Sequence, residues 1–193
     1  MSEQESTSHS SAVDPTVAAF LEGRCLSLRA AVTLVERSSL DGTVWRQWEE
    51  LRDIAVGKMQ RGELAAAERQ QWGRVAIRAV ERKRESSVEV KVAVAEEARV
   101  RAYLMCQFGP SDIESFRDPA ALLSLVVKNI GMDREEIARE ACNWMDLPRE
   151  GILELRRVKN MLTPLKEVSE SLKDGNPLWR EVESWASLVS KLP

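Results

Sequence analysis

Basic side chains recur at helical spacing in the middle of the sequence. Arg74, Arg78 and Arg82 are successive i, i+4 neighbours, so a helix would place them along one face. Cations in that arrangement can hold the phosphates of a nucleic acid, and each contact then releases counterions. Glu81 and Glu85 interleave with them, however. The alternative interpretation is a solvated helix face of mixed charge, and the interleaved glutamates favour it.

A second cationic segment, residues 133–162, has the outline of a helix-turn-helix. Two predicted helices meet at the tight turn NWMDLP, and the second would present basic side chains to DNA. Those side chains are Arg149, Arg156, Arg157 and Lys159. The turn lacks the usual glycine, and the start of the segment is acidic. Nucleic-acid binding, through this segment or through the arginines above, is therefore the alternative hypothesis for the function.

Residues for catalysis or metal binding are scarce. The only histidine is His9, in a polar leader, which leaves no Ser-His or Cys-His pair. Cys25, Cys106 and Cys142 lie far apart without a CxxC, and no glycine-rich phosphate loop occurs. Two carboxylate pairs have a spacing that could hold Mg²⁺, but they are distant from each other; they are Glu50 with Asp53 and Glu167 with Glu170. We predict no enzyme activity, no cofactor and no small-molecule substrate.

The composition of the 193-residue chain favours helices. It is 44% hydrophobic and 31% charged, with one Tyr and three Phe. Residues 1–13 are rich in Ser, Thr and Glu and predict a disordered tail. The start lacks the basic and apolar regions of a signal peptide, and no apolar run approaches the roughly 20 residues of a membrane span. These features predict a cytoplasmic protein, or one that acts inside a host cell.

Capping patterns divide the sequence into helices. The start signals are Asp14-Pro15, Ser111 with Glu114, Asp118-Pro119, Asp133 with Glu136, Asp146 with Pro148, Thr163-Pro164 and Asn176-Pro177. The helix after Asp118 is apolar almost all round, ends at Gly131 and is predicted to be buried. We predict an all-α, multi-helix bundle of about eight or nine helices. Longer helices occupy 14–107 and a compact group of shorter ones occupies 111–193; the two regions form one core or two.

The stretch SSVEVKVAV, residues 86–94, is ambiguous. Its valines alternate as they would in a half-buried strand, which would have to pair with a second copy of the chain because no partner strand is evident. We favour a helix, since the residues that follow are strong helix formers. Val88, Val92, Ala95, Arg99 and Ala102 would then share one face, and Ser86 and Ser87 would form the joint between two helices.

The end of the chain carries an apolar stripe of alternating four- and three-residue spacing, as in helices that pack on a partner helix. This terminal seam consists of Leu178, Val182, Trp185, Val189 and Leu192. Trp72, Trp179 and Trp185 are predicted core anchors. The leading hypothesis is a non-enzymatic adaptor, regulatory or accessory factor that acts through helix-mediated protein binding, with self-association as a homodimer.

Overall fold

The computed structural model describes residues 26–36, 45–86, 89–171 and 177–193. These ranges contain eight α-helices and no strand, which confirms the predicted all-α fold. The helices are α2 (Leu28–Glu36), α3 (Trp45–Met59), α4 (Ala66–Ser86), α5 (Val90–Phe108), α6 (Pro119–Ile130), α7 (Arg134–Cys142), α8 (Arg149–Ser171) and α9 (Pro177–Ala186). Three short 3₁₀ helices accompany them: η1 (Ser115–Arg117), η2 (Trp144–Asp146) and η3 (Ser187–Lys191). The tail predicted at 1–13 lies outside the described residues.

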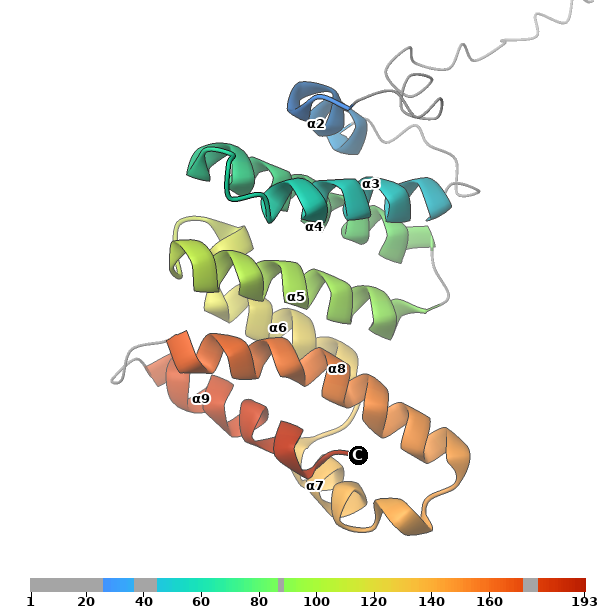
Figure 1. Cartoon of the computed structure of the whole chain (residues 1–193). Coiled ribbons are helices and arrows are strands. Elements are labelled where there is room, and N and C mark those ends of the chain that lie inside the picture. Colours follow the sequence, from blue (N-terminus) through green and yellow to red (C-terminus); the bar gives the residue numbers. More distant parts are fainter. Residues whose placement is uncertain (1–25, 37–44, 87–88, 172–176) are drawn as a thin grey trace, which may run out of the picture.

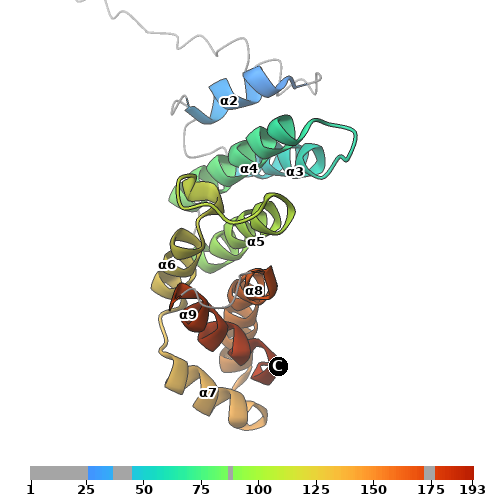
Figure 2. The same cartoon turned by 90° about the vertical axis from the view of Figure 1, so that its left-hand side faces the viewer.

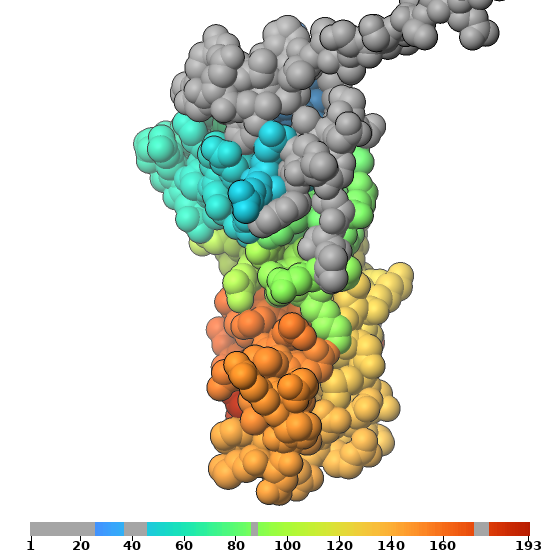
Figure 3. Space-filling view, turned by 90° about the vertical axis from the view of Figure 1, so that its right-hand side faces the viewer, coloured from blue at the N-terminus to red at the C-terminus, as the bar shows by residue number. Residues whose placement is uncertain are grey.

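The helices are stacked in layers that follow the order of the chain except at α7 (Figure 1). The helix α2 lies at one end on α4, and α3 and α4 form an antiparallel pair beneath it. The next layer is α5 with α6 at its side, followed by α8 with α9, and α7 lies at the far end (Figure 2). In the space-filling view the green of α4 and α5 separates the cyan of α3 from the orange of α8 (Figure 3). Within the described ranges, no helix has both the length and the apolar character needed to cross a bilayer.

Two hydrophobic clusters fill the stack, and α5 belongs to both. The N-terminal cluster is built from α2, α3 and α4, and Val100 and Leu104 of α5 join it. The C-terminal cluster is built from α6 to η3, and Val94, Ala98 and Met105 enter it from α5. The division between the two clusters therefore passes through α5, and not through the short segment that separates the predicted regions 14–107 and 111–193.

The ambiguous stretch is helical from Val90 onward, so the favoured interpretation is confirmed for the residues described there. Val88 lies outside them. The face predicted for Val92, Ala95, Arg99 and Ala102 is only partly buried, because Val92 and Arg99 are exposed while Ala95 and Ala102 are buried. The reason is tertiary: α4 and α8 pack on opposite sides of α5, so its buried residues do not form a single stripe.

Several predicted caps are present. The Asp118 carboxylate accepts a hydrogen bond from the Ala120 amide at 2.8 Å, and that of Asp133 accepts one from the Glu136 amide at 2.7 Å. Gly131 ends α6 in the left-handed conformation, with φ of 75°. The helix α6 is not buried all round as predicted, because Ala120 and Lys128 on its outer side are exposed. A single layer of neighbours covers only its inner side.

Two predicted helix starts differ from the structure. At the first, Ser111 Oγ accepts from the Glu114 amide at 3.2 Å, but the Glu114 carboxylate pairs with arginines and does not complete the capping box. At the second, Pro164 begins no helix and lies inside α8. Burial of Leu162 and Leu165 on the two sides of Pro164 compensates for the backbone hydrogen bond that proline cannot make. Asn176 lies outside the described residues.

Candidate functional site

The terminal seam faces the interior of the chain. Val182, Trp185, Val189 and Leu192 are buried in the C-terminal cluster, and Leu178 packs against that cluster half-buried. The surface that they cover belongs largely to α8 of the same chain. The seam is thus core, which corrects its interpretation as a surface for a partner helix. The tryptophans behave as predicted: Trp72 and Trp185 are buried, and half-buried Trp179 donates its indole N–H to the Ser169 carbonyl at 3.1 Å.

The four cations of the helix-turn-helix outline all lie on α8 and differ in their surroundings. Arg149 and Arg156 are exposed on α8, whereas Arg157 lies 3.5 Å from Glu154. The Lys159 ammonium donates to the carbonyls of Leu192 and Pro193, at 2.9 and 3.2 Å, and so holds the chain end. The helix α8 packs along α5 and α9, so one of its sides is covered by other helices of the same chain (Figure 1).

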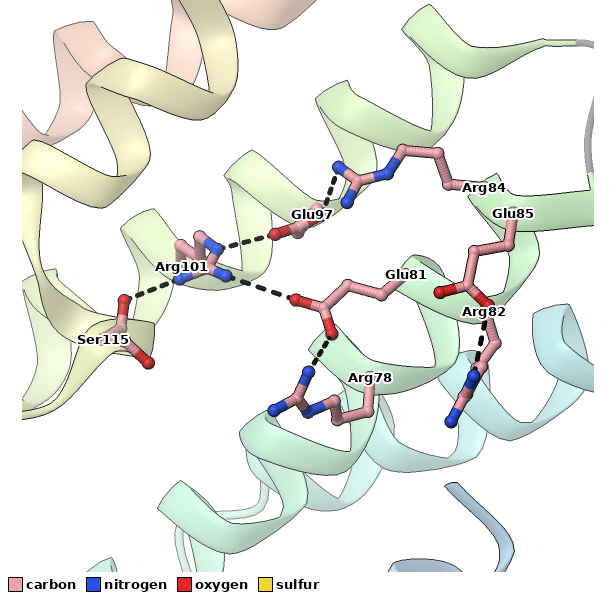
Figure 4. Close-up of polar contacts among 8 residues, drawn as sticks. All are labelled: Arg78, Glu81, Arg82, Arg84, Glu85, Glu97, Arg101 and Ser115. Carbon is pink, nitrogen blue, oxygen red and sulfur yellow. Dashed lines mark hydrogen bonds and ion pairs between the residues drawn. The ribbon is translucent and has the colours of Figure 1, made fainter. Parts of the chain in front are cut away.

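The arginines predicted to share a helix face do lie along α4, and each has a carboxylate partner. Arg74 donates to Glu114 at 2.9 Å. Arg78 donates to Glu81 at 2.6 Å, and Arg82 donates to Glu85 at 3.2 Å (Figure 4). The interleaved glutamates thus pair with the cations, as the interpretation of a mixed-charge face requires.

Two hollows flank this part of α4. The first, about 490 Å³, lies between α2 and α4 over a partly apolar floor. The second, about 390 Å³, lies between α4, α5 and the segment around η1. Residues of the first include Val32, Val35, Val75 and Arg82; residues of the second include Ile77, Arg101, Ile113 and Phe116. Arg74, Arg78 and Glu81 line both hollows, so the two are adjacent recesses on either side of one ridge. We call this surface the α4 ridge.

The wall of the second hollow combines an aromatic ring with guanidinium groups. The Arg74 guanidinium carbon lies 4.3 Å from the centre of the buried Phe116 ring, and that of Arg117 lies 5.8 Å from it. Arg117 also donates to the carbonyls of Phe108 and Gly109, each at 2.7 Å, which fixes the segment before η1. Ile113, in that segment, has 90% of its side chain exposed at the edge of the hollow. An arginine on an aromatic face beside a free apolar side chain is typical of protein-binding surfaces.

A buried carboxylate supports the ridge from beneath. Glu97 of α5 is only 1% exposed and accepts hydrogen bonds from Arg84 at 3.0 Å and from Arg101 at 2.9 Å. Arg101 reaches Glu81 at 3.6 Å and donates to the Ser115 carbonyl at 2.7 Å (Figure 4). Burial raises the pKa of Glu97, and its two arginine partners oppose that rise. The ionic contacts join α4, α5 and η1, so they determine where Glu81 and Arg101 stand in the second hollow.

A second ionic group joins α3 to α4 and α5. Lys83, 7% exposed, donates to Glu49 at 3.0 Å and to Glu96 at 3.1 Å. Arg52 of α3 also reaches Glu96, at 2.6 Å. Neither ionic group was predicted from the sequence. A signal for one of them existed, since Glu97 is three residues from each of the buried Val94 and Val100, a spacing that puts a carboxylate on an apolar part of a helix.

The described residues contain no group of three or more His, Cys, Asp or Glu side chains placed to hold a metal ion. In the two carboxylate pairs, all four side chains are exposed. Cys106 and Cys142 are free and exposed, and Cys25 lies outside the described residues.

The comparisons with known proteins identify no relative. No family model matches the chain, and neither the curated proteins nor the solved structures contain a match.

Proposed function

We propose that this chain is a non-enzymatic protein-binding module, an adaptor or accessory factor that binds a segment of another protein on the α4 ridge. The observation that supports the proposal is that Arg74, Arg78 and Glu81 line both hollows, so the two hollows and the ridge between them form one continuous surface. That surface mixes apolar, aromatic and arginine groups, the composition that binding sites for protein segments favour.

The pairing of charges favours a protein over a nucleic acid as the partner. Glu81, Glu85 and Glu114 alternate with the arginines of the ridge, so a phosphate backbone laid along it would find no continuous row of cations, whereas a single side chain can pair with one arginine. In the other candidate segment, 133–162, Lys159 already donates to the carbonyls of Leu192 and Pro193, and Arg157 lies 3.5 Å from Glu154. Nucleic acid thus remains the alternative that the experiment must exclude.

A selection of random displayed peptides on the immobilised full chain tests the proposal. The counter-selection uses the double variant Arg78→Glu with Ile113→Ser, which alters two exposed side chains of the ridge. We expect peptides that bind the wild type and not this variant. The matched control combines Arg156→Glu with Met145→Ser, which alters an exposed arginine and an exposed apolar residue elsewhere, and it should retain the peptides.

The result that would contradict the proposal is specific. If no peptide prefers the wild type, while labelled duplex DNA or RNA binds with a steep salt dependence that Arg78→Glu removes, the ridge binds nucleic acid. Circular dichroism melting curves of both double variants, coincident with that of the wild type, would show that the folded chain is being compared in each case.

A further inference from the structure

We propose that the second hollow of the α4 ridge receives an acidic segment of a partner protein, whose carboxylate pairs with Arg78 and Arg74 while a neighbouring apolar side chain packs on Ile113. This inference rests on the proposed function and specifies the chemistry of its partner. Charge balance, the free donors of the arginines and the exposure of Ile113 each contribute to it.

The ion pairs around the second hollow leave a surplus of positive charge. In one group Glu114 is shared by two arginines, Arg74 at 2.9 Å and Arg117 at 2.5 Å. In the other group, three arginines share two glutamates (Figure 4). Glu81 pairs with Arg78 and Arg101, and Glu97 pairs with Arg84 and Arg101. Arginines exceed carboxylates by one in each group, so an incoming carboxylate meets an attractive potential.

Arg78 is the side chain best placed to meet that carboxylate. It is 66% exposed and lines the hollow, and its hydrogen bond to Glu81 uses Nη1 alone. A guanidinium carries five N–H donors in a planar fork, so one carboxylate does not saturate it. Binding of a second carboxylate to the same fork is a charge-assisted interaction, and these are the stronger hydrogen bonds of protein interfaces.

Ile113 supplies the apolar half of the recognition. An isoleucine with 90% of its side chain exposed leaves apolar area in water, and the hollow beside it is floored by Ile77 and Phe116. A partner side chain seated there would remove apolar surface of both molecules from water. A peptide segment can carry an acidic residue next to an apolar one, whereas a phosphate backbone has no apolar side chain.

The experiment uses the full chain and three fluorescein-labelled peptides in anisotropy titrations. The probe repeats the triplet Glu-Glu-Leu; one control replaces each Glu with Gln, and the other replaces each Leu with Ser. We expect the probe to bind at least about tenfold more tightly than the Gln control, the equivalent of one charge-assisted contact. Its affinity should fall as salt is added, because the contacts lie at the surface.

Single variants locate the site. Arg78→Glu should weaken binding of the probe by about tenfold or more. Ile113→Ser should weaken the probe and leave the Ser-containing peptide unchanged. The matched controls Arg156→Glu and Met145→Ser should bind the probe as the wild type does. Equal binding of the Glu and Gln peptides, or no effect of Arg78→Glu, would overturn the inference.

Failure of this inference is distinguishable from failure of the proposed function. If the displayed-peptide selection yields neutral peptides that depend on Ile113 but not on Arg78, the ridge binds protein and the acidic specificity is wrong. If duplex DNA competes with the probe and binds more tightly in an Arg78-dependent manner, both proposals fail together.

Discussion

The two sides of α5 are packed by different physical means. On the side of α6 and α8, Val94, Ala98 and Met105 enter an apolar cluster. On the side of α3 and α4, apolar residues are interrupted by two buried charges, Lys83 and Glu97. Removal of a charge from water costs free energy that its partner restores only with good geometry, whereas apolar burial is favourable without orientation. The C-terminal side therefore contributes most to stability, and the N-terminal side orients specific groups.

The proposed binding surface adjoins the ionic side of α5. Glu81 belongs both to the α4 ridge and to the network around Glu97, through Arg101. A surface of exposed charged side chains is ordinarily mobile, and buried partners restrict that motion. The C-terminal apolar cluster thus supports the stack, while the ionic groups around Glu97 and Lys83 hold in place the side chains that we propose to be functional.

The largest effect should come from the apolar side. Replacement of Leu162 by Ala removes a fully buried side chain of α8 and should lower the free energy of unfolding by about 3 kcal/mol, with about 2–5 as the usual range. Urea denaturation followed by circular dichroism measures it. Leu153→Ala, on the exposed side of the same helix, is the matched control and should change stability little. Equal losses in the two variants would contradict the assignment of the core.

A glycine tests how closely α4 and α5 approach. A Cβ at Gly73 would lie 2.7 Å from the methyl carbons of Leu104, so Gly73→Ala should cost about 1–3 kcal/mol through overpacking. At Gly57 of α3 a Cβ would meet nothing within 4 Å, and Gly57→Ala should stabilise the chain by about 0.5–1 kcal/mol. Thermal melting of both variants measures the contrast. A gain from both would mean that the helices are not in close contact at Gly73.

The third change addresses the ionic side. Lys83→Met keeps an unbranched side chain but removes the charge shared by Glu49 and Glu96, and it should cost about 1–2 kcal/mol. The loss is below that for an isolated buried pair because Glu96 retains Arg52 and Glu49 is partly exposed. Lys128→Met, at an exposed position of α6, should have almost no effect in the same denaturation experiment. A gain in stability would show that desolvation of Lys83 outweighs its ion pairs.

The smallest effect is a dependence on pH. Burial raises the pKa of Glu97 in the folded chain, while Arg84 and Arg101 oppose the rise and Glu81 adds to it. A carboxyl whose folded-state pKa is raised contributes stability that is present below its unfolded-state pKa and is lost as pH rises through the folded-state value. Relative to Glu97→Gln, the wild type should therefore lose stability between acidic and neutral pH. Denaturation of the wild type and of Glu97→Gln over that pH range measures the difference between their free energies of unfolding. If the wild type instead gained stability relative to Glu97→Gln as the pH rose, the effect of the arginines on the pKa would outweigh that of burial.

The sequence alone was sufficient to predict the helical class and the starts of helices such as α6 and α7. Capping residues such as Asp118 and Asp133 act on backbone groups within a few residues, so their effect is readable locally. The helix start predicted at Pro164 is wrong because the local signal is outweighed by burial of the helical turns of α8 on both sides of the proline.

Which helix faces remain uncovered by other helices depends on the tertiary structure. Spacing alone predicts a partner surface for the terminal seam and a solvated face for the arginines of α4, because helical spacing shows that a face exists and not what covers it. Packing against α8 placed the seam in the core, and the approach of η1 to α4 created the second hollow beside Arg74 and Arg78. The ionic groups of Lys83 and Glu97 likewise join helices distant in sequence. Such contacts depend on how the layers stack, which no single helix specifies.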